Sequence, residues 1–237
     1  TDTIFGTIGG GNLEYLVIDE ARNLIDNNIA NKVMNIPLGP GIGQCCGGYV
    51  QVKLSLYNNS KDALKNENFV NDFKPNLYIF GSGHIGQALI SKLENINFNT
   101  FIIDSREDYL KMTNIKDINY LLSKKPWEIV SKLEDNSYFI VLTHSHDYDL
   151  KILNEILKKN NTFVGLIGSL TKKKRFHKRL IDNGHNKSIV EKIECPIGID
   201  IGNSKDPNEI AFSIITRIIS IKNSLKHLSN NKIKEVI

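Results

Sequence analysis

The chain has 237 residues, 41% of them hydrophobic, a length that suits one large domain or two modest ones. Its formal net charge of +4 is mild and gives no indication of a nucleic-acid partner. The sequence shows no run of about 18 apolar residues and no secretory leader, so we expect neither a membrane span nor export. Its three cysteines include an adjacent pair, Cys45 and Cys46, which argues against a disulfide framework and for reduced thiols in the cytoplasm.

The chain begins with a glycine-rich segment that leads into a predicted helix. Asn12 is the expected N-cap, and apolar residues then recur at helical spacing as far as Ile25. Backbone amides at a helix N-terminus suit an anionic group such as a phosphate, which makes Gly9 and Gly10 candidate binding residues. The alternative is that these glycines only shape a tight turn.

A second glycine loop carries the cysteine pair in the stretch LGPGIGQCCGG, residues 38–48. It is followed by YVQVKLSLY, whose alternating apolar residues predict a half-buried strand over 49–57. We therefore expect a smaller N-terminal α+β domain over 1–57. Residues 58–74 are rich in asparagine and lysine and are predicted to be a linker.

From residue 75 onward, short apolar runs alternate with amphipathic segments. This rhythm predicts a C-terminal α/β domain over 75–237, a Rossmann-like doubly wound parallel sheet with helices on both faces. The expected strands are 77–80, 100–104, 118–122, 138–144 and 162–168.

The first turn of this domain, GSGHIG, has the G-x-G-x-x-G spacing that lets a backbone approach a pyrophosphate at the start of a helix. Asp104 ends the second predicted strand, close to where an acid that binds ribose is expected. Two features depart from a plain dehydrogenase, since a histidine stands inside the loop and an arginine follows the acid. The candidate residues here are Gly81, Gly83, His84, Gly86, Asp104 and Arg106.

The fourth predicted strand ends in LTHSHDYD, which approaches the H-x-H-x-D-H zinc signature of metallo-β-lactamase-like hydrolases but has Tyr148 and Asp149 in its last two places. His144 and His146 could still bind a metal ion together. Alternatively, Thr143 and Asp147 cap a helix and the histidines contact the edge of the sheet.

Further along the chain, Ser169 is the expected N-cap of a basic helix. Its charges favour a solvated face, with contact to an acidic partner or a phosphate as the alternative. A last amphipathic helix is expected to start at Pro207, and Cys195 is placed in a loop at the end of the sheet. The basic residues are Lys172, Lys173, Lys174, Arg175, Lys178 and Arg179.

Several blocks of this sequence resemble, in order, those of the XdhC/CoxI family, the xanthine dehydrogenase accessory proteins. The most specific are the Q-C-C-G-G loop and the P-I-G-x-D-I-G block. The resemblance spans nearly the whole chain and rests on GTIGGGNLE, LGPGIGQCCGG, FGSGHIGQAL, IIDSRE, LTHSHDYDL, VGLIGS and CPIGIDIG with DPNEIAFSI.

The resemblance implies a chaperone more than a catalyst: a protein that binds the molybdenum cofactor, has it sulfurated with help from a cysteine desulfurase, and hands it to a molybdenum hydroxylase apo-enzyme. A homodimer is also implied. Cys45 or Cys46, with Cys45 favoured, would contact the metal or a sulfur relay, because soft thiolates suit both. The neighbouring loop residues Gly43, Gln44 and Gly47 would help to close the loop around the pterin.

In the Rossmann-like half, the ligand stays open among three possibilities. If the cofactor is a cytosine dinucleotide, the glycine loop holds its pyrophosphate, Asp104 binds a ribose, and His84, His144 and His146 surround the pterin or metal end. If the cofactor is plain molybdopterin, the loop holds its single phosphate. The third possibility is NAD(P) as a regulatory or redox ligand.

Three departures from the family pattern stand out. The chain is expected to be an N-terminally shortened member, Ser105 replaces an aspartate in the D-D-R block, and Glu194 stands where a histidine is common. Two other functions stay open, an NAD(P)-dependent oxidoreductase and a zinc hydrolase that uses His144 and His146. The favoured chaperone includes no metal site of its own.

Overall fold

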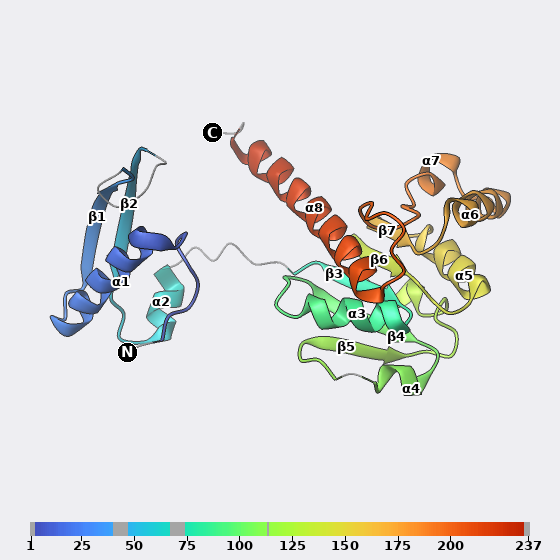
Figure 1. Cartoon of the computed structure of the whole chain (residues 1–237), viewed down its shortest axis with the longest axis horizontal. Coiled ribbons are helices and arrows are strands. Elements are labelled where there is room, and N and C mark those ends of the chain that lie inside the picture. Colours follow the sequence, from blue (N-terminus) through green and yellow to red (C-terminus); the bar gives the residue numbers. More distant parts are fainter. Residues whose placement is uncertain (1–2, 40–46, 67–73, 113, 235–237) are drawn as a thin grey trace. The chain divides into compact units, whose positions relative to one another are not determined.

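The computed structural model describes residues 3–39, 47–66, 74–112 and 114–234. The chain divides into two units, residues 1–71 and residues 72–237, and each is described by itself (Figure 1). In the part of the chain that is described, no helix is long and apolar enough to cross a membrane.

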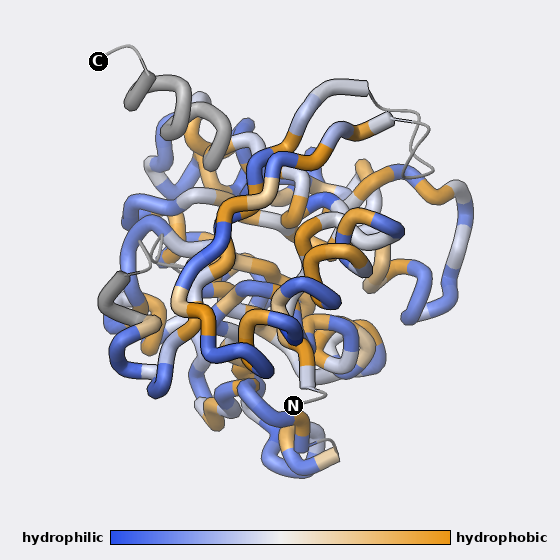
Figure 2. The backbone as a smooth tube through the Cα atoms, turned by 90° about the vertical axis from the view of Figure 1, so that its left-hand side faces the viewer, coloured by the Kyte–Doolittle hydropathy of each residue, from blue (hydrophilic) through white to orange (hydrophobic). Residues whose placement is uncertain are grey.

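The N-terminal unit is a helix packed on a two-stranded antiparallel sheet, which confirms the α+β prediction. Its core is small: the buried side chains are Leu13, Val17 and Leu24 of the helix and Ile36 of the first strand. In Figure 2 the two strands run side by side, and apolar residues alternate with polar ones along β2. The elements are α1 (Gly11–Asp26), β1 (Asn31–Pro37), β2 (Tyr49–Ser55) and α2 (Ser60–Asn66).

Three details of this unit differ from the sequence-based expectations. Helix α1 begins one residue before Asn12, with Gly10 as its N-cap, because consecutive glycines with positive φ turn the chain directly into the helix. Strand β1, which the sequence analysis did not anticipate, pairs with β2 along its whole length. The predicted linker, residues 58–74, contains the short helix α2.

Five parallel strands form the sheet of the C-terminal unit, in the order β5-β4-β3-β6-β7. This is the Rossmann order, and it confirms the predicted fold and all five predicted strands. The order reverses between β3 and β6, so the ligand-binding crevice of such a sheet is expected at the carboxyl ends of these two strands. The strands are β3 (Asn76–Phe80), β4 (Asn99–Asp104), β5 (Ile118–Leu122), β6 (Ser137–Val141) and β7 (Asn161–Leu166).

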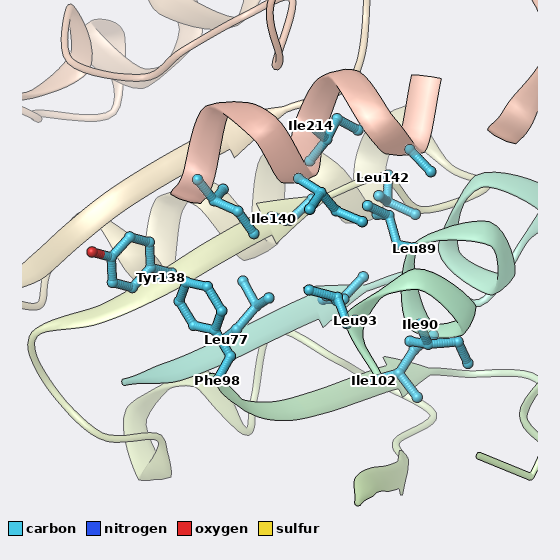
Figure 3. Close-up of a cluster of buried hydrophobic side chains, with 14 of the residues drawn as sticks. Leu77, Leu89, Ile90, Leu93, Phe98, Ile102, Tyr138, Ile140, Leu142 and Ile214 are labelled. Carbon is cyan, nitrogen blue, oxygen red and sulfur yellow. The ribbon is translucent and has the colours of Figure 1, made fainter. Parts of the chain in front are cut away.

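Helices cover both faces of this sheet. Helices α3 and α8 cover one face, where Leu89 of α3 and Ile214 of α8 pack against Leu77 and Ile140 of the strands (Figure 3). Helices α5 and α6 cover the other face. The elements are α3 (His84–Leu93), α4 (Glu107–Leu110), η2 (Val130–Lys132), α5 (His146–Ile156), α6 (Leu170–Asp182), α7 (Lys187–Val190) and α8 (Pro207–Lys234).

Burial explains why the strands are so apolar. All five residues of β6 are buried, because this strand lies between β3 and β7 and is covered by helices on both sides. Beyond β7, the backbone of Glu194 continues the sheet: its N–H donates to Val164 O and its carbonyl accepts from Leu166 N, both at 2.9 Å. The loop that starts at Cys195 is thereby fixed to the same edge as the turns after β3 and β6.

Candidate functional site

The turn between β3 and α3 is built from the predicted glycine motif. A Cβ on Gly81 would lie 2.4 Å from Leu142 O, and one on Gly86 would lie 2.1 Å from Gly81 O, so neither position accepts a side chain. A Cβ on Gly83 would meet nothing within 4 Å. Two glycines therefore serve tight packing of turn and helix, while the middle one faces open space. This is the division of roles expected where a backbone approaches a pyrophosphate. His84 follows as an exposed first residue of α3.

Asp104 and Arg106 form a closed ion pair at the end of β4. Asp104 Oδ1 accepts hydrogen bonds from Arg106 N and Nε, both at 2.9 Å, and Oδ2 accepts from Arg106 Nη2 at 2.9 Å. Oδ2 also accepts from Ser82 N of the glycine turn at 2.7 Å. Burial alone would raise the pKa of Asp104, but the hydrogen bonds from Arg106 and Ser82 outweigh it and lower that pKa. The carboxylate is therefore ionised and fully engaged at neutral pH.

The guanidinium of Arg106 is held on its other side by an aromatic ring. Its Cζ lies 3.7 Å from the centroid of Tyr109, a cation–π contact. The hydrogen bonds to Asp104 raise the pKa of Arg106. The side chain is 29% exposed.

A small depression lies at the switch point between β3 and β6. Gly81, Ser105, Pro126, His144 and Tyr148 contribute to its lining. His144 and Tyr148 meet edge to face, with ring centroids 5.4 Å apart. The depression is too small to enclose a ring, so a planar group could only lie across it, in contact with the edge of Tyr148.

The loop that carries both histidines is held by a buried ion pair. Lys172 Nζ donates to Asp149 Oδ2 at 2.7 Å and to Ile167 O at 2.8 Å. Asp149 Oδ1 in turn accepts from Thr143 N at 3.0 Å and Thr143 Oγ1 at 2.6 Å. The side chain of Asp149 is fully buried and that of Lys172 is 8% exposed. This network ties the start of α5 to the start of α6.

This network corrects two sequence-based interpretations. Lys172 does not belong to a solvated face, because it lies four residues before the buried Phe176 and turns inward with it. Helix α5 is capped by Ser145, whose side chain accepts from Tyr148 N, rather than by Thr143 and Asp147. Ser169 is confirmed as the N-cap of α6. The sequence pattern identified Asp149 only as a departure from the zinc signature, although it lies three and four residues before the buried Ile152 and Leu153, a spacing that indicates burial.

His144 and His146 are both exposed, and each contacts another side chain: His144 meets Tyr148, and His146 meets Arg175. His146 Nδ1 lies 2.9 Å from Arg175 Nη2, and a cation at that distance disfavours a metal ion on the same nitrogen. Among the described residues, no group of three histidine, cysteine, aspartate or glutamate side chains is placed to hold a metal ion. The zinc hydrolase alternative therefore gains no support from the described part of the chain.

Cys195 lies behind this network, in the loop after the sheet, as predicted. Its side chain is 3% exposed, and its Sγ lies 3.8 Å from Gly168 O. Burial raises the pKa of Cys195, so the group is a neutral thiol at neutral pH rather than a nucleophilic thiolate. Glu194, at the position where a histidine was expected from the resemblance, pairs instead with Arg217 at 2.7 Å.

In the N-terminal unit, the glycine loop before α1 binds a carboxylate of its own chain. Glu14 Oε1 accepts from Thr7 Oγ1 at 2.6 Å and from Ile8 N at 3.0 Å, and Thr7 Oγ1 accepts from Gly9 N at 3.1 Å. The hydrogen bonds from Thr7 and Ile8 lower the pKa of Glu14. The loop that carries Gly9 and Gly10 thus already surrounds a negative charge.

The base of the thiol loop is anchored by the hairpin, although most of the loop lies outside the described residues. Leu38 N donates to Gly48 O at 2.9 Å, so the pairing of β1 with β2 continues to this base. Gly47 has a φ of 62° in the turn that enters β2. The candidate residues Gly43, Gln44, Cys45 and Cys46 fall outside the described ranges.

Of the predicted binding residues, those of the Rossmann unit meet at one edge of its sheet. There the turn of Gly81 adjoins both the end of β4 at Asp104 and the loop of His144. Asp149, which is paired with Lys172, fixes that loop through its hydrogen bond from Thr143 N. Gly9, Gly10 and Gly47 belong to the other unit.

Comparison with known proteins agrees with this architecture. The XdhC Rossmann domain matches residues 77–218. The uncharacterized protein YqeB of Escherichia coli is 24% identical over 94% of this chain and 39% of its own length. A probable xanthine dehydrogenase subunit of Bacillus subtilis is 27% identical over 63% of this chain and 43% of its own length. The chain thus spans about two fifths of these curated relatives.

Among solved structures, a crystal structure described as a xanthine dehydrogenase from Bacillus halodurans superposes with a TM-score of 0.72. It is 18% identical and covers 94% of this chain and 84% of its own, a likeness that concerns the fold. The family domain covers more than half of the chain, over the strands and turns that build the edge described above. The chain belongs to the XdhC family, and residues 77–218 are its XdhC Rossmann domain.

Proposed function

We propose that this chain acts in the maturation of a xanthine dehydrogenase-type molybdenum hydroxylase: it binds the molybdenum cofactor, supports its sulfuration by a cysteine desulfurase and delivers it to the apo-enzyme. Family membership is the observation that carries this proposal, together with the name of the Bacillus subtilis relative. The role is that of a carrier, and no bond-making step is assigned to the chain itself.

The residues at the sheet edge fit the chemistry of such a cofactor. Its pterin is planar and could lie across the shallow depression lined by His144, Tyr148 and Pro126, in contact with the aromatic edge of Tyr148. Its phosphate is anionic and suits the open backbone at Gly83. Arg175, whose Nη2 contacts His146, adds a positive charge near the histidine loop.

The thiol loop supplies the second part of the proposal. A bound molybdenum centre offers a soft metal with an exchangeable sulfur ligand, and thiolates are the protein groups best matched to it. Cys45 and Cys46 are the candidates for that contact, since the third cysteine, Cys195, is buried and neutral. The hairpin holds the two ends of the loop together at Leu38 and Gly48, so the pair of thiols would be presented from a fixed base.

The test is the pterin content of the protein. The chain is purified without oxygen from cells that make the cofactor, and the oxidised pterin is quantified by fluorescence. We expect about one pterin per chain in the parent and a loss of roughly tenfold in Cys45→Ser or Cys46→Ser, because a thiolate–metal contact is worth at least as much as a charged hydrogen bond.

Cys195→Ser is the matched control, because it also removes one thiol but lies in the core of the Rossmann unit. It is expected to retain its pterin. Absence of pterin from the parent protein would refute the proposal. Equal losses in all three variants would show that the effect is not specific to the thiol loop and would refute its proposed contact with the cofactor.

A further inference from the structure

The carboxylate of Asp104, at the end of β4, has no hydrogen-bond acceptor site left for a ligand. A carboxylate offers about four lone-pair sites. Those of Asp104 take the hydrogen bonds from Ser82 N, Arg106 N, Arg106 Nε and Arg106 Nη2, at 2.7 to 2.9 Å. The side chain is 2% exposed, so water does not compete for these positions.

This arrangement changes what the position can recognise. In dinucleotide-binding sheets the acid here accepts a hydrogen bond from a ribose hydroxyl, whereas a nearby arginine accommodates a 2′-phosphate. A hydroxyl that approached Asp104 would have to displace a charge-assisted bond from Arg106. A phosphate would instead meet the remaining N–H donors of the guanidinium, which Asp104 and Tyr109 already hold in one orientation.

A second cation contacts the backbone between Asp104 and Arg106. Lys124 follows β5, the neighbour of β4, and its Nζ lies 3.2 Å from the carbonyl oxygen of Ser105, between Asp104 and Arg106 in sequence. Lys124 is exposed and keeps further donors for an anion. Of the nearby carboxylates, Glu107 is paired with Lys111 at 2.6 Å, and Asp108 is exposed to solvent.

We propose that this end of the sheet recognises the 2′-phosphorylated ribose of a dinucleotide such as NADP, with Arg106 and Lys124 as the phosphate ligands. Asp104 is then a positioning residue that orients Arg106. The bound nucleotide would extend from Arg106 across the open backbone at Gly83 toward the switch point. This ligand would share the open backbone at Gly83 with the cofactor phosphate proposed above, so the two would exclude each other there, and separate measurements test them.

The experiment measures the affinities of the full chain for NADP⁺ and NAD⁺ by calorimetry. These two probes differ only in the 2′-phosphate. We expect NADP⁺ to bind at least about tenfold more tightly, which is the size of one hydrogen bond to a charged group. Raising the salt concentration should reduce the difference between the two affinities, because the contact of the 2′-phosphate with Arg106 is an ion pair at a partly exposed site.

Three variants complete the test. Arg106→Gln should bring NADP⁺ down to the affinity of NAD⁺, and Lys124→Gln should lower it severalfold while leaving the Asp104–Arg106 pair intact. Lys116→Gln is the matched control: it removes the same charge from an exposed lysine just before β5, at the opposite edge of the sheet, and should change neither affinity.

Equal affinities for the two dinucleotides, tighter binding of NAD⁺, or no binding of either up to about 10 mM would each overturn this inference. A preference for NADP⁺ that survives both Arg106→Gln and Lys124→Gln would also overturn it. None of these results alters the pterin measurement, which tests the delivery function separately.

Discussion

Among single residues, two predicted ligand positions are engaged by side chains of the same chain. Glu14 accepts hydrogen bonds from the first glycine loop, and Asp104 accepts hydrogen bonds from Arg106. Both carboxylates have lowered pKa values because of these bonds. A ligand at either place must therefore compete with an existing charged contact. At Asp104 this competition favours groups that bind the free N–H donors of Arg106.

The ion pair at Asp104 predicts a specific dependence of stability on pH. The pKa of Asp104 is lower in the folded protein than in the unfolded chain, so its contribution is complete above the unfolded value of about 4 and is lost as pH falls through the lowered folded value. Replacing Arg106 by glutamine should therefore destabilise the protein by about 1–3 kcal/mol at pH 7 and by less at about pH 3.

Urea denaturation of the parent and of Arg106→Gln at both pH values measures this difference. The exposed Lys116→Gln serves as the control and should show little change at either pH. If Arg106→Gln lowers the free energy of unfolding equally at the two pH values, or more in acid, the ion pair with Asp104 does not stabilise the protein as described.

Among the elements, the turn between β3 and α3 depends on two glycines for packing and leaves the third open. Gly81 has a φ of 117°, a region that side chains rarely adopt, and Gly86 lies against the carbonyl oxygen of Gly81. Gly83 has a φ of −75° and an unobstructed Cβ position. The same motif thus contains a position that packing requires, Gly86, and an unobstructed one, Gly83, three residues apart.

This division predicts opposite outcomes for two alanine substitutions. Gly86→Ala should lower the free energy of unfolding by about 3 kcal/mol, because the new methyl group would overlap Gly81 O and force α3 away from β3. Gly83→Ala should stay within about 1 kcal/mol of the parent. Chemical denaturation of the two variants side by side provides the measurement. Equal losses of stability would show that Gly83 is also required for packing.

In the molecule as a whole, the two units differ in the size of their hydrophobic cores. The Rossmann unit buries both faces of its central strands, whereas the N-terminal unit has a two-stranded sheet with Val33 52% exposed and Tyr49 76% exposed. A two-stranded sheet with few buried side chains is only marginally stable by itself.

Hydrogen exchange of the full chain should reflect this difference. Amides of β3 and β6 are expected to exchange only through global unfolding of their unit. Those of β1 and β2 should open at a free energy at least about 2 kcal/mol lower. Mass spectrometry of peptides from both units gives the rates. If β1 and β2 exchange as slowly as β6, additional interactions must protect the hairpin.

Much of the fold follows from local features of the sequence. The five strands of the Rossmann unit are short apolar runs, the central ones because they are buried on both faces, and the alternation of strands with helices predicts that they run parallel. The placement of Gly81, Asp104 and His144 at one edge follows as well, since parallel strands end on the same side. The sequence does not predict strand β1, because its apolar residues Val33, Met34 and Ile36 do not alternate strictly with the asparagines and the lysine between and before them.

Local patterns thus suffice for the Rossmann architecture and for the edge where its site lies, because periodicity and glycine spacing act over a few residues. They do not reveal which polar side chains already have hydrogen-bond partners within the chain. Only the tertiary structure shows those partners. Lys172 and Asp149 are 23 positions apart, and Ser82 and Asp104 are 22 apart. Such pairs form only when strands and helices are packed together, so no local pattern distinguishes a buried partner from a free ligand.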